Sequence, residues 1–549
     1  IGFVVGNSTF VNNSAADGAG AILNGGRGFV VGNSTFVNNT ATSKGGAIYN
    51  YGIGFVVGNS TFANNTAEDA GAVYNEGDNS VVGNSTFVNN TATSIGGAII
   101  NNGKLVVDNS AFEDNAANYY GGAIFNRDDL QVTNSAFDGN DILVRNIRAM
   151  DNVDHGGAAI YNWKNGKLDI SKSNFTNNIK NYKNGNLLVG AVATIGDATI
   201  SDSYFVNNSG RWGGAISASG YLIAGDDVNT LTVSGSTFKE NGGLYGAGIF
   251  VAGSDFTVSD CVFDKNTAFG KGNMTPNNNN GAAIEVTDTN KAIAGTIAGS
   301  KFTNNKAQYG GAIYICEGNI AISDSLFENN SADVEGGAID IDSAINNPVV
   351  TVENSKFVNN TPQAIHNSKE LHLGIETFTD LQNAIDLVDG ILTLDSDIAM
   401  TDDEAAGFVG GVAINKDIVI DGKGHTIDAK TLGRIFSIGE GFTVTLTNAT
   451  LINGKATEGG AIYNDGSLTL SDVKLSDNAA DNYGGAVFNN GELVVSDSVF
   501  DSNDIVNRGS ASVDYGGAAI YNWYDGVLTV SGSNFTNNIK NYKNGDRLV

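Results

Sequence analysis

The chain is poor in several residue types, and each shortage excludes a class of protein. Its 549 residues include only 3 prolines, 2 cysteines, 4 histidines and 3 tryptophans. So little proline excludes a proline-rich stalk, and two cysteines exclude a disulfide-framed scaffold. The histidines form no pair at the spacing of a zinc site, so we expect no metal and no other cofactor. No run of about 18 apolar residues is present, so we expect no membrane insertion within this segment.

Basic residues are also scarce. Lysine and arginine total 30 against 59 acidic residues, a formal net charge of −29. Such a field repels nucleic acid, which we therefore do not expect as a partner. A hydrophobic content of 41% excludes a disordered chain. Cys261 and Cys316 lie about two repeats apart, too far for a disulfide, so we expect two inert, partly buried thiols.

Repetition is what the chain has in abundance. The word "GFVVGNSTF" begins at Gly2, Gly28 and Gly54, and "VVGNSTF" returns at Val81. A globular core has no use for verbatim copies, because each of its positions meets different neighbours. Stacked structural units do, because each copy packs against another copy. Since the first residue already lies inside a repeat, we expect this segment to belong to a longer polypeptide.

One unit, "KLVVDNSAFEDNAANYYGGAIFN" from Lys104, shows how the repeat folds. Its apolar positions come in pairs two residues apart, which is typical of strands with one buried face. This alternation breaks at Asp108-Asn109 and at Gly121-Gly122, which indicates corners. Three short strands and three corners per coil of about 25 residues predict an all-β fold, a right-handed parallel β-helix.

A phenylalanine recurs once per coil and defines an inward column. Asparagine stands three residues after it, as at Asn115, and is expected to pass amide hydrogen bonds from coil to coil. The paired glycines are expected to supply positive φ or close backbone approach. The column comprises Phe10, Phe36, Phe62, Phe87, Phe112, Phe137, Phe175, Phe205, Phe238, Phe263, Phe302, Phe327 and Phe357, and resumes with Leu451, Leu475, Phe500 and Phe535.

One segment breaks the strand rhythm. In Thr377–Leu387 the apolar residues fall at helical spacing, with Thr377 or Thr379 as N-cap and Gly390 as stop. We interpret it as a short amphipathic helix that caps a second β-helix. The predicted division is a first β-helix module at residues 1–374, a capping helix with opening coils at 375–440, and further coils of the second module at 441–549.

A longer repeat overlies the short one. "SNFTNNIKNYKNG" occurs at Ser173–Gly185 and at Ser533–Gly545, and "GGAAIYNW" begins at Gly156 and at Gly516, both 360 residues apart.

These words resemble two families. "GGAI" and "FxxN" are similar to the repeats of the polymorphic outer-membrane adhesins of obligate intracellular bacteria. The chain is closer still to methanogen adhesin-like proteins with pectin-lyase-like β-helices. In those proteins, words like Phe378–Asp386, Ile414–Ala429 and Gly433–Ile438 open each module. The resemblance implies a β-helix at the cell surface; it does not imply a particular chemistry.

The same fold also carries polysaccharide lyases and glycoside hydrolases, so an enzyme is the alternative. Those enzymes need paired carboxylates or an Asp-rich calcium site with a nearby base. The acidic residues here are scattered, and we predict no catalytic residue. "DGKGHTIDAK" around His425 resembles a catalytic Gly-His-Gly word, but Thr426 replaces the second glycine, so we assign His425 to an early-coil strand. The loop acids Asp402, Asp403 and Glu404 are expected to be solvated.

Aromatic residues near the corners are the candidate ligand-binding residues, because exposed rings suit stacking on sugars or anchoring a protein. The alternative is that each tryptophan only caps a corner or covers an inserted loop. The inserted loops enter at one corner and so share a face: Asp141–His155, Ile179–Val189, Thr267–Asn280 and Asp504–Tyr515. The candidates are Tyr161, Trp163, Tyr182, Tyr521, Trp523 and Tyr542.

The chain is also rich in Asn-x-Ser/Thr sequons, some of which follow simply from its abundant asparagine. In a surface protein, the outward ones are acceptors for glycans. They include Asn7, Asn12, Asn33, Asn38, Asn59 and Asn64.

Three functions follow from these features. The leading hypothesis is a non-catalytic, extracellular adhesin-like protein on the cell surface, whose partners are glycans or surface proteins of other cells. The second is a polysaccharide-degrading enzyme. The third is a purely structural sheath or spacer whose binding is self-association.

Overall fold

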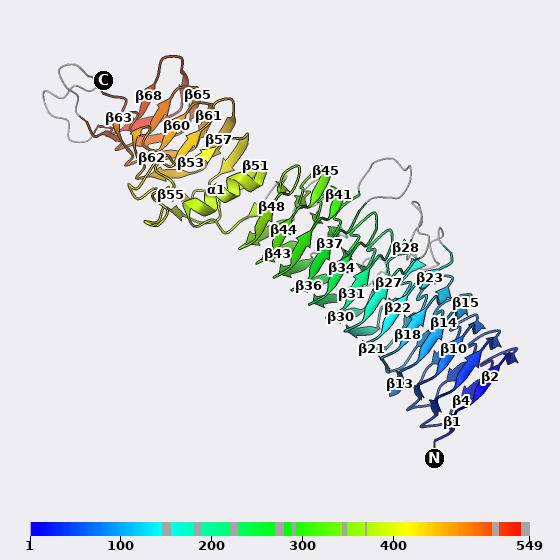
Figure 1. The fold of residues 1–549 in the computed structure, drawn as a ribbon. Helices are drawn as coiled ribbons and strands as arrows, with labels where there is room; N and C mark the ends of the chain where they lie inside the picture. Colours follow the sequence, from blue (N-terminus) through cyan, green and yellow to red (C-terminus); the bar gives the residue numbers. More distant parts are fainter. Residues whose placement is uncertain are drawn as a thin grey trace. The chain divides into compact units, whose positions relative to one another are not determined.

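A computed structural model describes residues 2–144, 155–179, 188–219, 229–268, 279–287, 293–342, 348–367, 371–507 and 515–539. The chain separates into two compact units. Unit 1 comprises Ile1–Pro348 and Asn354–Ala364, and unit 2 comprises Val349–Glu353 and Ile365–Val549. Each unit is a stack of coils whose strands pair in parallel with the next coil (Figure 1). The expected parallel β-helix is confirmed, whereas the finer domain boundaries stay predictions.

Unit 1 contains four ladders of parallel strands, which we name sheets A to D in chain order. Sheet A contains β1 (Val4–Gly6), β5 (Val30–Gly32), β9 (Val56–Gly58), β13 (Ser80–Gly83), β17 (Leu105–Asp108), β21 (Asp129–Thr133), β26 (Lys167–Ser171), β30 (Asp197–Ser201), β33 (Thr230–Ser234), β36 (Asp255–Ser259), β39 (Ala294–Ala298) and β43 (Asn319–Ser323). Sheet B contains β2 (Thr9–Val11), β6 (Thr35–Val37), β10 (Thr61–Ala63), β14 (Thr86–Val88), β18 (Ala111–Glu113), β22 (Ala136–Asp138), β27 (Asn174–Thr176), β31 (Tyr204–Val206), β34 (Thr237–Lys239), β37 (Val262–Asp264), β40 (Lys301–Thr303), β44 (Leu326–Glu328) and β48 (Lys356–Val358). Sheet C contains β3 (Ser14–Ala15), β7 (Thr40–Ala41), β11 (Thr66–Ala67), β15 (Thr91–Ala92), β19 (Ala116–Ala117) and β23 (Asp141–Ile142). Sheet D contains β4 (Ile22–Asn24), β8 (Ile48–Asn50), β12 (Val73–Asn75), β16 (Ile99–Asn101), β20 (Ile124–Asn126), β25 (Ile160–Asn162), β29 (Val192–Thr194), β32 (Ile216–Ser219), β35 (Ile249–Ala252), β38 (Ile284–Thr287), β42 (Ile313–Ile315) and β46 (Ile339–Ile341). Two further pairs join β24 (His155–Gly156) to β28 (Leu188–Val189) and β41 (Lys306–Tyr309) to β45 (Ser331–Glu335).

Unit 2 repeats this arrangement and adds one helix, α1 (Phe378–Leu387). Sheet E contains β49 (Ile365–Asn367), β51 (Val388–Thr393), β54 (Ile418–Asp421), β57 (Thr443–Thr447), β61 (Ser467–Ser471), β65 (Glu492–Ser496) and β69 (Val527–Ser531). Sheet F contains β52 (Ile398–Ala399), β55 (Thr426–Asp428), β58 (Thr450–Ile452), β62 (Lys474–Ser476), β66 (Val499–Asp501) and β70 (Asn534–Thr536). Sheet G contains β53 (Val412–Ile414), β56 (Phe436–Ile438), β60 (Ile462–Asn464), β64 (Val487–Asn489) and β68 (Ile520–Asn522). Sheet H contains β59 (Lys455–Glu458), β63 (Ala479–Tyr483) and β67 (Asp504–Ile505), and β47 (Val349–Glu353) pairs with β50 (Leu371–His372).

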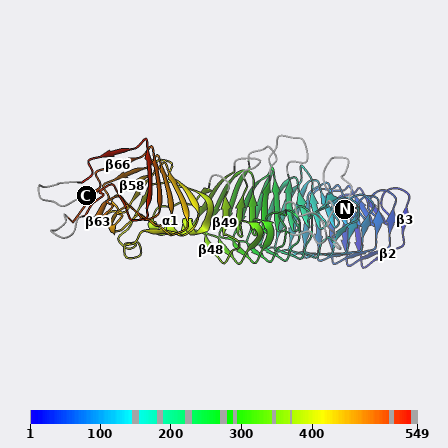
Figure 2. The same ribbon diagram turned by 90° about the horizontal axis from the view of Figure 1, so that it is seen from above.

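The core of unit 1 lies inside the coils, where the residues predicted to face inward are buried. Leu105, Phe112 and Ile124, from the three main strands of one coil, are each at most 2% exposed. The Phe112 ring stacks on Phe87 at 4.8 Å and on Phe137 at 4.7 Å, with planes within 5°. Strand pairing sets this spacing, so each phenylalanine is its neighbour's packing partner. Figure 2 shows the stacked coils of unit 1 from above.

Asparagine and glycine residues form the corners of the coil. Asn90 donates from Nδ2 to Oδ1 of Asn115 at 2.9 Å, which confirms the predicted amide ladder. Gly121 has φ of +63°, which favours glycine, and a Cβ on Gly122 would lie 2.3 Å from the carbonyl oxygen of Ala158. The two glycines therefore have different roles, one conformational and one steric.

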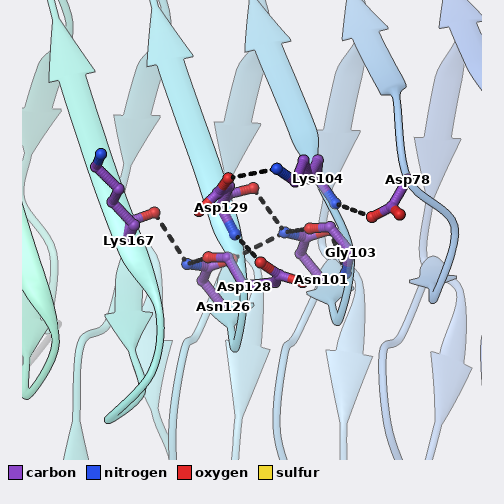
Figure 3. Close-up of polar contacts among 8 residues, drawn as sticks. All are labelled: Asp78, Asn101, Gly103, Lys104, Asn126, Asp128, Asp129 and Lys167. Carbon is purple, nitrogen blue, oxygen red and sulfur yellow. Dashed lines mark hydrogen bonds and ion pairs between the residues drawn. The ribbon is translucent and has the colours of Figure 1, made fainter.

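The corner between sheets D and A carries a second polar ladder (Figure 3). Asn101 donates from Nδ2 to Oδ1 of Asn126 at 2.8 Å and to the carbonyl oxygen of Asp129 at 3.2 Å. On its exposed side, the Lys104 ammonium lies 3.2 Å from the Asp129 carboxylate. Buried amides thus join consecutive coils, while the charged groups stay in solvent.

Two predictions about the coil need correction. Sheet C and its counterpart sheet H add a fourth strand that the three-strand prediction missed. In sheet C, as at β19, this strand has only two residues, which carry no periodicity. In unit 2 the inward column begins before Leu451, because Ile427 pairs with Leu451 and Ile398 pairs with Ile427. Isoleucine fills the place of phenylalanine in these opening coils.

The helix α1 forms where it was predicted. Thr377 is its N-cap and exchanges hydrogen bonds with Asp380 in a capping box, while Phe378 and Leu381 are buried. The helix packs on β51 and β53 within unit 2. Gly390 does not end it, because the chain turns into β51 at Val388 and Gly390 lies inside that strand.

Both cysteines are free thiols, as expected, but they are fully and not partly buried. Burial raises the pKa of the Cys261 thiol to about 11, which keeps it unreactive at neutral pH. Among the residues described by the structure, no helix has the length and apolarity needed to cross a membrane.

Candidate binding surface

The outward face of sheet D carries an unusual column of large side chains. In each strand the middle residue points away from the coil interior, and in most sheets of a solenoid such a residue is solvated. Here Tyr74, Phe125 and Tyr161 are outward yet only 4%, 1% and 1% exposed. Other side chains must therefore cover this face.

The cover comes from the corners on either side of sheet D. Tyr120 precedes the paired glycines and Trp163 directly follows β25, and both rings lie against Phe125 and Tyr161. We call Tyr120, Phe125, Tyr161 and Trp163 the first four-ring cluster. The Tyr120 and Tyr161 centroids are 4.6 Å apart, and Phe125 stacks on Tyr161 at 5.7 Å. Trp163 stays half-buried at the margin, so one of its sides reaches solvent.

Unit 2 contains the same constellation. Tyr483, Phe488, Tyr521 and Trp523 form the second four-ring cluster. Tyr483 lies 4.6 Å from Tyr521, and Phe488 stacks on Tyr521 at 5.7 Å, the two separations found in the first cluster. The Tyr–Trp separation is 5.9 Å in this cluster and 6.0 Å in the first. The long repeat therefore copies a three-dimensional ring arrangement as well as a sequence.

The predicted ligand-binding residues that the structure describes differ in their exposure to solvent. Tyr161 is buried, so the expectation of an exposed ring is wrong there, because the corner residue Tyr120 covers it. Trp163 and Tyr521 are half-buried, and Trp523 is 46% exposed. Burial raises the pKa of Tyr521. Tyr182 and Tyr542 lie outside the described residues.

Sequence reasoning missed half of each cluster. Tyr120 and Phe125 belong to the word "NYYGGAIFN", and their equivalents Tyr483 and Phe488 belong to "NYGGAVFNN". The signal is an aromatic residue directly before the paired glycines and another three residues after the second glycine.

The ends of two inserts lie on the clusters. His155, at the end of Asp141–His155, is fully buried with its ring 5.6 Å from Tyr120. Its Nδ1 lies 3.1 Å from the carbonyl oxygen of Val144, and burial lowers the pKa of its imidazole. In unit 2, Tyr515 takes this place, 5.7 Å from Tyr483. The greater part of each insert lies outside the described residues.

Charged groups flank the outward column further along sheet D. The Lys44 ammonium lies 4.6 Å from the ring centroid of Tyr74 and 3.4 Å from the Glu76 carboxylate. Burial lowers the pKa of Lys44, but Tyr74, Tyr49 and Glu76 outweigh it and raise the pKa overall. A cation over an aromatic face stabilises the column and presents a polar rim.

His425 and Glu404 do not have the surroundings that the sequence predicted for them. His425 lies in the turn before β55 and not on a strand, with Nδ1 3.4 Å from Oδ1 of Asp397. Glu404 accepts hydrogen bonds from the backbone nitrogens of Thr379, in the first turn of α1, and of Thr401. Burial raises the pKa of Glu404, but these hydrogen bonds outweigh it and lower the pKa to about 2. Asp402 and Asp403 are exposed, as expected, whereas Glu404 instead anchors the start of the helix.

Comparison with known proteins gives limited matches. The model of the Chlamydia polymorphic membrane protein repeat matches residues 33–51, 299–316 and 324–342. Each matched stretch contains one strand of the phenylalanine column and the paired glycines that follow it. These three stretches are therefore similar to the repeats of that family. Among curated proteins, the search finds no match.

Two solved structures are similar in outline. The complex of the alginate lyase AlyF-OU02 with G6 is 10% identical, covers 91% of this chain and 79% of its own, and has a TM-score of 0.24. A PL6 alginate lyase complexed with a trisaccharide is 12% identical, with coverages of 94% and 79% and a TM-score of 0.22. Likeness at this level carries no argument about activity.

Proposed function

We propose that this chain is a non-catalytic adhesin-like protein, extracellular and on the cell surface, whose β-helix presents aromatic contact sites to glycans or surface proteins of other cells. The four-ring cluster, which recurs in both units with the same ring separations, is the observation that carries the proposal. An enzyme needs one assembled cleft. A weak contact that recurs along a chain gains strength through avidity.

The chemistry of the cluster supports a stacking site. Trp163 and Trp523 occupy equivalent margins, each backed by a packed tyrosine that fixes its orientation. A tryptophan held against rigid neighbours loses little side-chain entropy on binding and offers an apolar face for a sugar ring or an anchor residue. The polymorphic membrane protein matches further support a surface protein.

The test is a binding screen of the chain against arrayed glycans and intact cells. We expect weak binding by one immobilised chain and much stronger apparent binding on a multivalent surface. The double variant Trp163→Ala and Trp523→Ala should lose that binding. Tyr204→Ala is the matched control, because Tyr204 is an exposed aromatic residue that belongs to sheet B and not to either cluster.

The other two functions predict different results. Binding that survives the double variant while its thermal unfolding is unchanged would overturn the assignment to the clusters. Depolymerisation of pectin-like polymers or alginate by the purified chain would favour the lyase or hydrolase. Self-association without any glycan or cell binding would favour a structural sheath.

A further inference from the structure

Eight sequons of unit 1 occupy two recurrent backbone positions, one on each side of sheet B. Each of the first four coils has an asparagine just before sheet B and another just after it, and each residue two positions on is threonine or serine. All eight asparagines are in the left-handed region, with φ between 48° and 57°, and all eight are exposed. They are Asn7, Asn12, Asn33, Asn38, Asn59, Asn64, Asn84 and Asn89.

Backbone conformation alone does not explain this choice. Asparagine tolerates the left-handed region well, so a corner asparagine needs no further reason. Yet the same corner in later coils is filled by Lys172, Asp202 or Gly235, each also with positive φ. The fold therefore accepts other residues there. In the first four coils both corners carry an asparagine with a hydroxyl residue two positions on. Among the later coils that the structure describes, the sequon is complete at only one of the two corners, at Asn207, Asn329, Asn359 and Asn448.

The geometry separates these asparagines from the structural ones beside them. Asn39 is fully buried and holds the amide ladder, whereas its neighbour Asn38 is exposed. Within the described part of the chain, the Nδ2 atoms of Asn33, Asn38 and Asn59 have no protein hydrogen bond, so the atom that a glycan would join is free.

We propose that these eight asparagines are N-glycosylation sites. The co-reactant is a lipid diphosphate-linked oligosaccharide. The asparagine Nδ2 forms a bond to C1 of the first sugar and loses one proton, and the bond from C1 to the diphosphate oxygen breaks, releasing the lipid diphosphate. The inference requires export of the chain, but it does not depend on which ligand the four-ring clusters bind.

The placement has a consequence for partners. The asparagines form two columns, one at each end of strands β2, β6, β10 and β14 of sheet B. Within a column, neighbouring asparagines lie about 4.8 Å apart from coil to coil. Glycans on both columns cover the outward face of that sheet. Flat protein docking is then excluded from sheet B in these coils and left to other faces, which include sheet D with its first four-ring cluster.

The fifth coil supplies a built-in control. Asn109 occupies the same exposed corner with φ of 45°, but the residue two positions on is Ala111, so the sequon is incomplete. Asn109 must therefore stay unmodified. Completing the sequon with Ala111→Thr should add a glycan there without moving the backbone, because position 111 is an outward strand position like Thr86.

The experiment is site-resolved mass spectrometry of the full chain. In chain isolated from its native cells we expect glycan on the eight asparagines and none on Asn109 or Asn134. In chain secreted from a host with a sequon-dependent oligosaccharyltransferase, Thr86→Ala should abolish the glycan on Asn84 and leave Asn59 modified. Ala111→Thr should create occupancy at Asn109.

Three outcomes would overturn the inference. They are native chain unmodified at all eight positions, occupancy at Asn84 that survives Thr86→Ala, and Asn109 still bare after Ala111→Thr while its neighbours are modified. None of these results depends on ligand binding by the clusters, so failure of the proposed function is recognised separately.

Discussion

The side-chain amide of Asn65 donates to Oδ1 of Asn90, one coil further on, at 2.9 Å, and the backbone nitrogen of Asn65 donates to the same oxygen at 3.0 Å. Both residues are fully buried. One carbonyl oxygen thus satisfies two donors of the preceding coil. This relationship, repeated from coil to coil, lets a polar residue sit inside an apolar stack, because no amide group is left without a partner.

Asn90→Ala should therefore destabilise unit 1 strongly. The change removes the acceptor for two Asn65 donors and leaves the Phe62 carbonyl oxygen without the amide of Asn90. Each buried polar group left without a hydrogen bond costs about 1–3 kcal/mol. We therefore expect the free energy of unfolding, measured with denaturant, to fall by about 3 kcal/mol or more. Asn89→Gly, at an exposed left-handed corner, is the control and should change the free energy of unfolding little.

Phe112→Ala should cost about 3–5 kcal/mol, from lost burial and the cavity left between Phe87 and Phe137. Because a solenoid spreads stability over neighbouring coils, we expect local opening before global unfolding. Hydrogen exchange of amides in β14, β18 and β22 measures it. Glu113→Ala, exposed on the same strand, should stay within about 0.5 kcal/mol of the parent. Equal effects of the two changes would contradict the inward column.

Gly122→Ala tests the close approach of consecutive coils. The new methyl group would lie 2.3 Å from the Ala158 carbonyl oxygen and 2.5 Å from that of Asp141, both backbone atoms that cannot rotate away. We expect a loss of at least about 1–3 kcal/mol, measured as a lower midpoint in urea. Gly32→Ala is the control, because a Cβ there meets nothing within 4 Å.

Glu404 should make unit 2 sensitive to acid. Its pKa in the folded state, about 2, lies below the ordinary value near 4.3 in the unfolded chain. The folded state therefore favours the carboxylate, and this stabilisation is complete above about pH 5 and is lost as the pH falls through 4.3 toward 2.

The variant Glu404→Gln should remove that part of the pH dependence and cost about 1–2 kcal/mol at pH 7, after allowance for solvent screening of a half-exposed group. Thermal unfolding between pH 2 and pH 7 measures both effects. Asp403→Asn, exposed in the same loop, should leave the pH profile unchanged.

Much of the fold was predictable because its determinants are local. The alternation around Leu105 and Val107, the phenylalanine column and the paired glycines each recur at fixed spacing. In a parallel β-helix, the nearest neighbour in space is the same position one coil away. A verbatim repeat therefore identifies the packing partner of each residue, which is the same residue in the next coil. The helix at Phe378–Leu387 was equally predictable from the sequence, because its N-cap and its apolar face lie within one short segment.

The sequence by itself thus determined the coil, the inward columns, the amide ladder and the helix. Only the tertiary structure decided that Tyr161 is an outward ring with almost no exposure. Burial of an outward side chain depends on residues distant along the chain, here Tyr120, which periodicity does not connect to it. The tertiary structure also assigned Glu404 to the start of α1, because a hydrogen bond from a carboxylate to a distant backbone nitrogen leaves no pattern in the sequence.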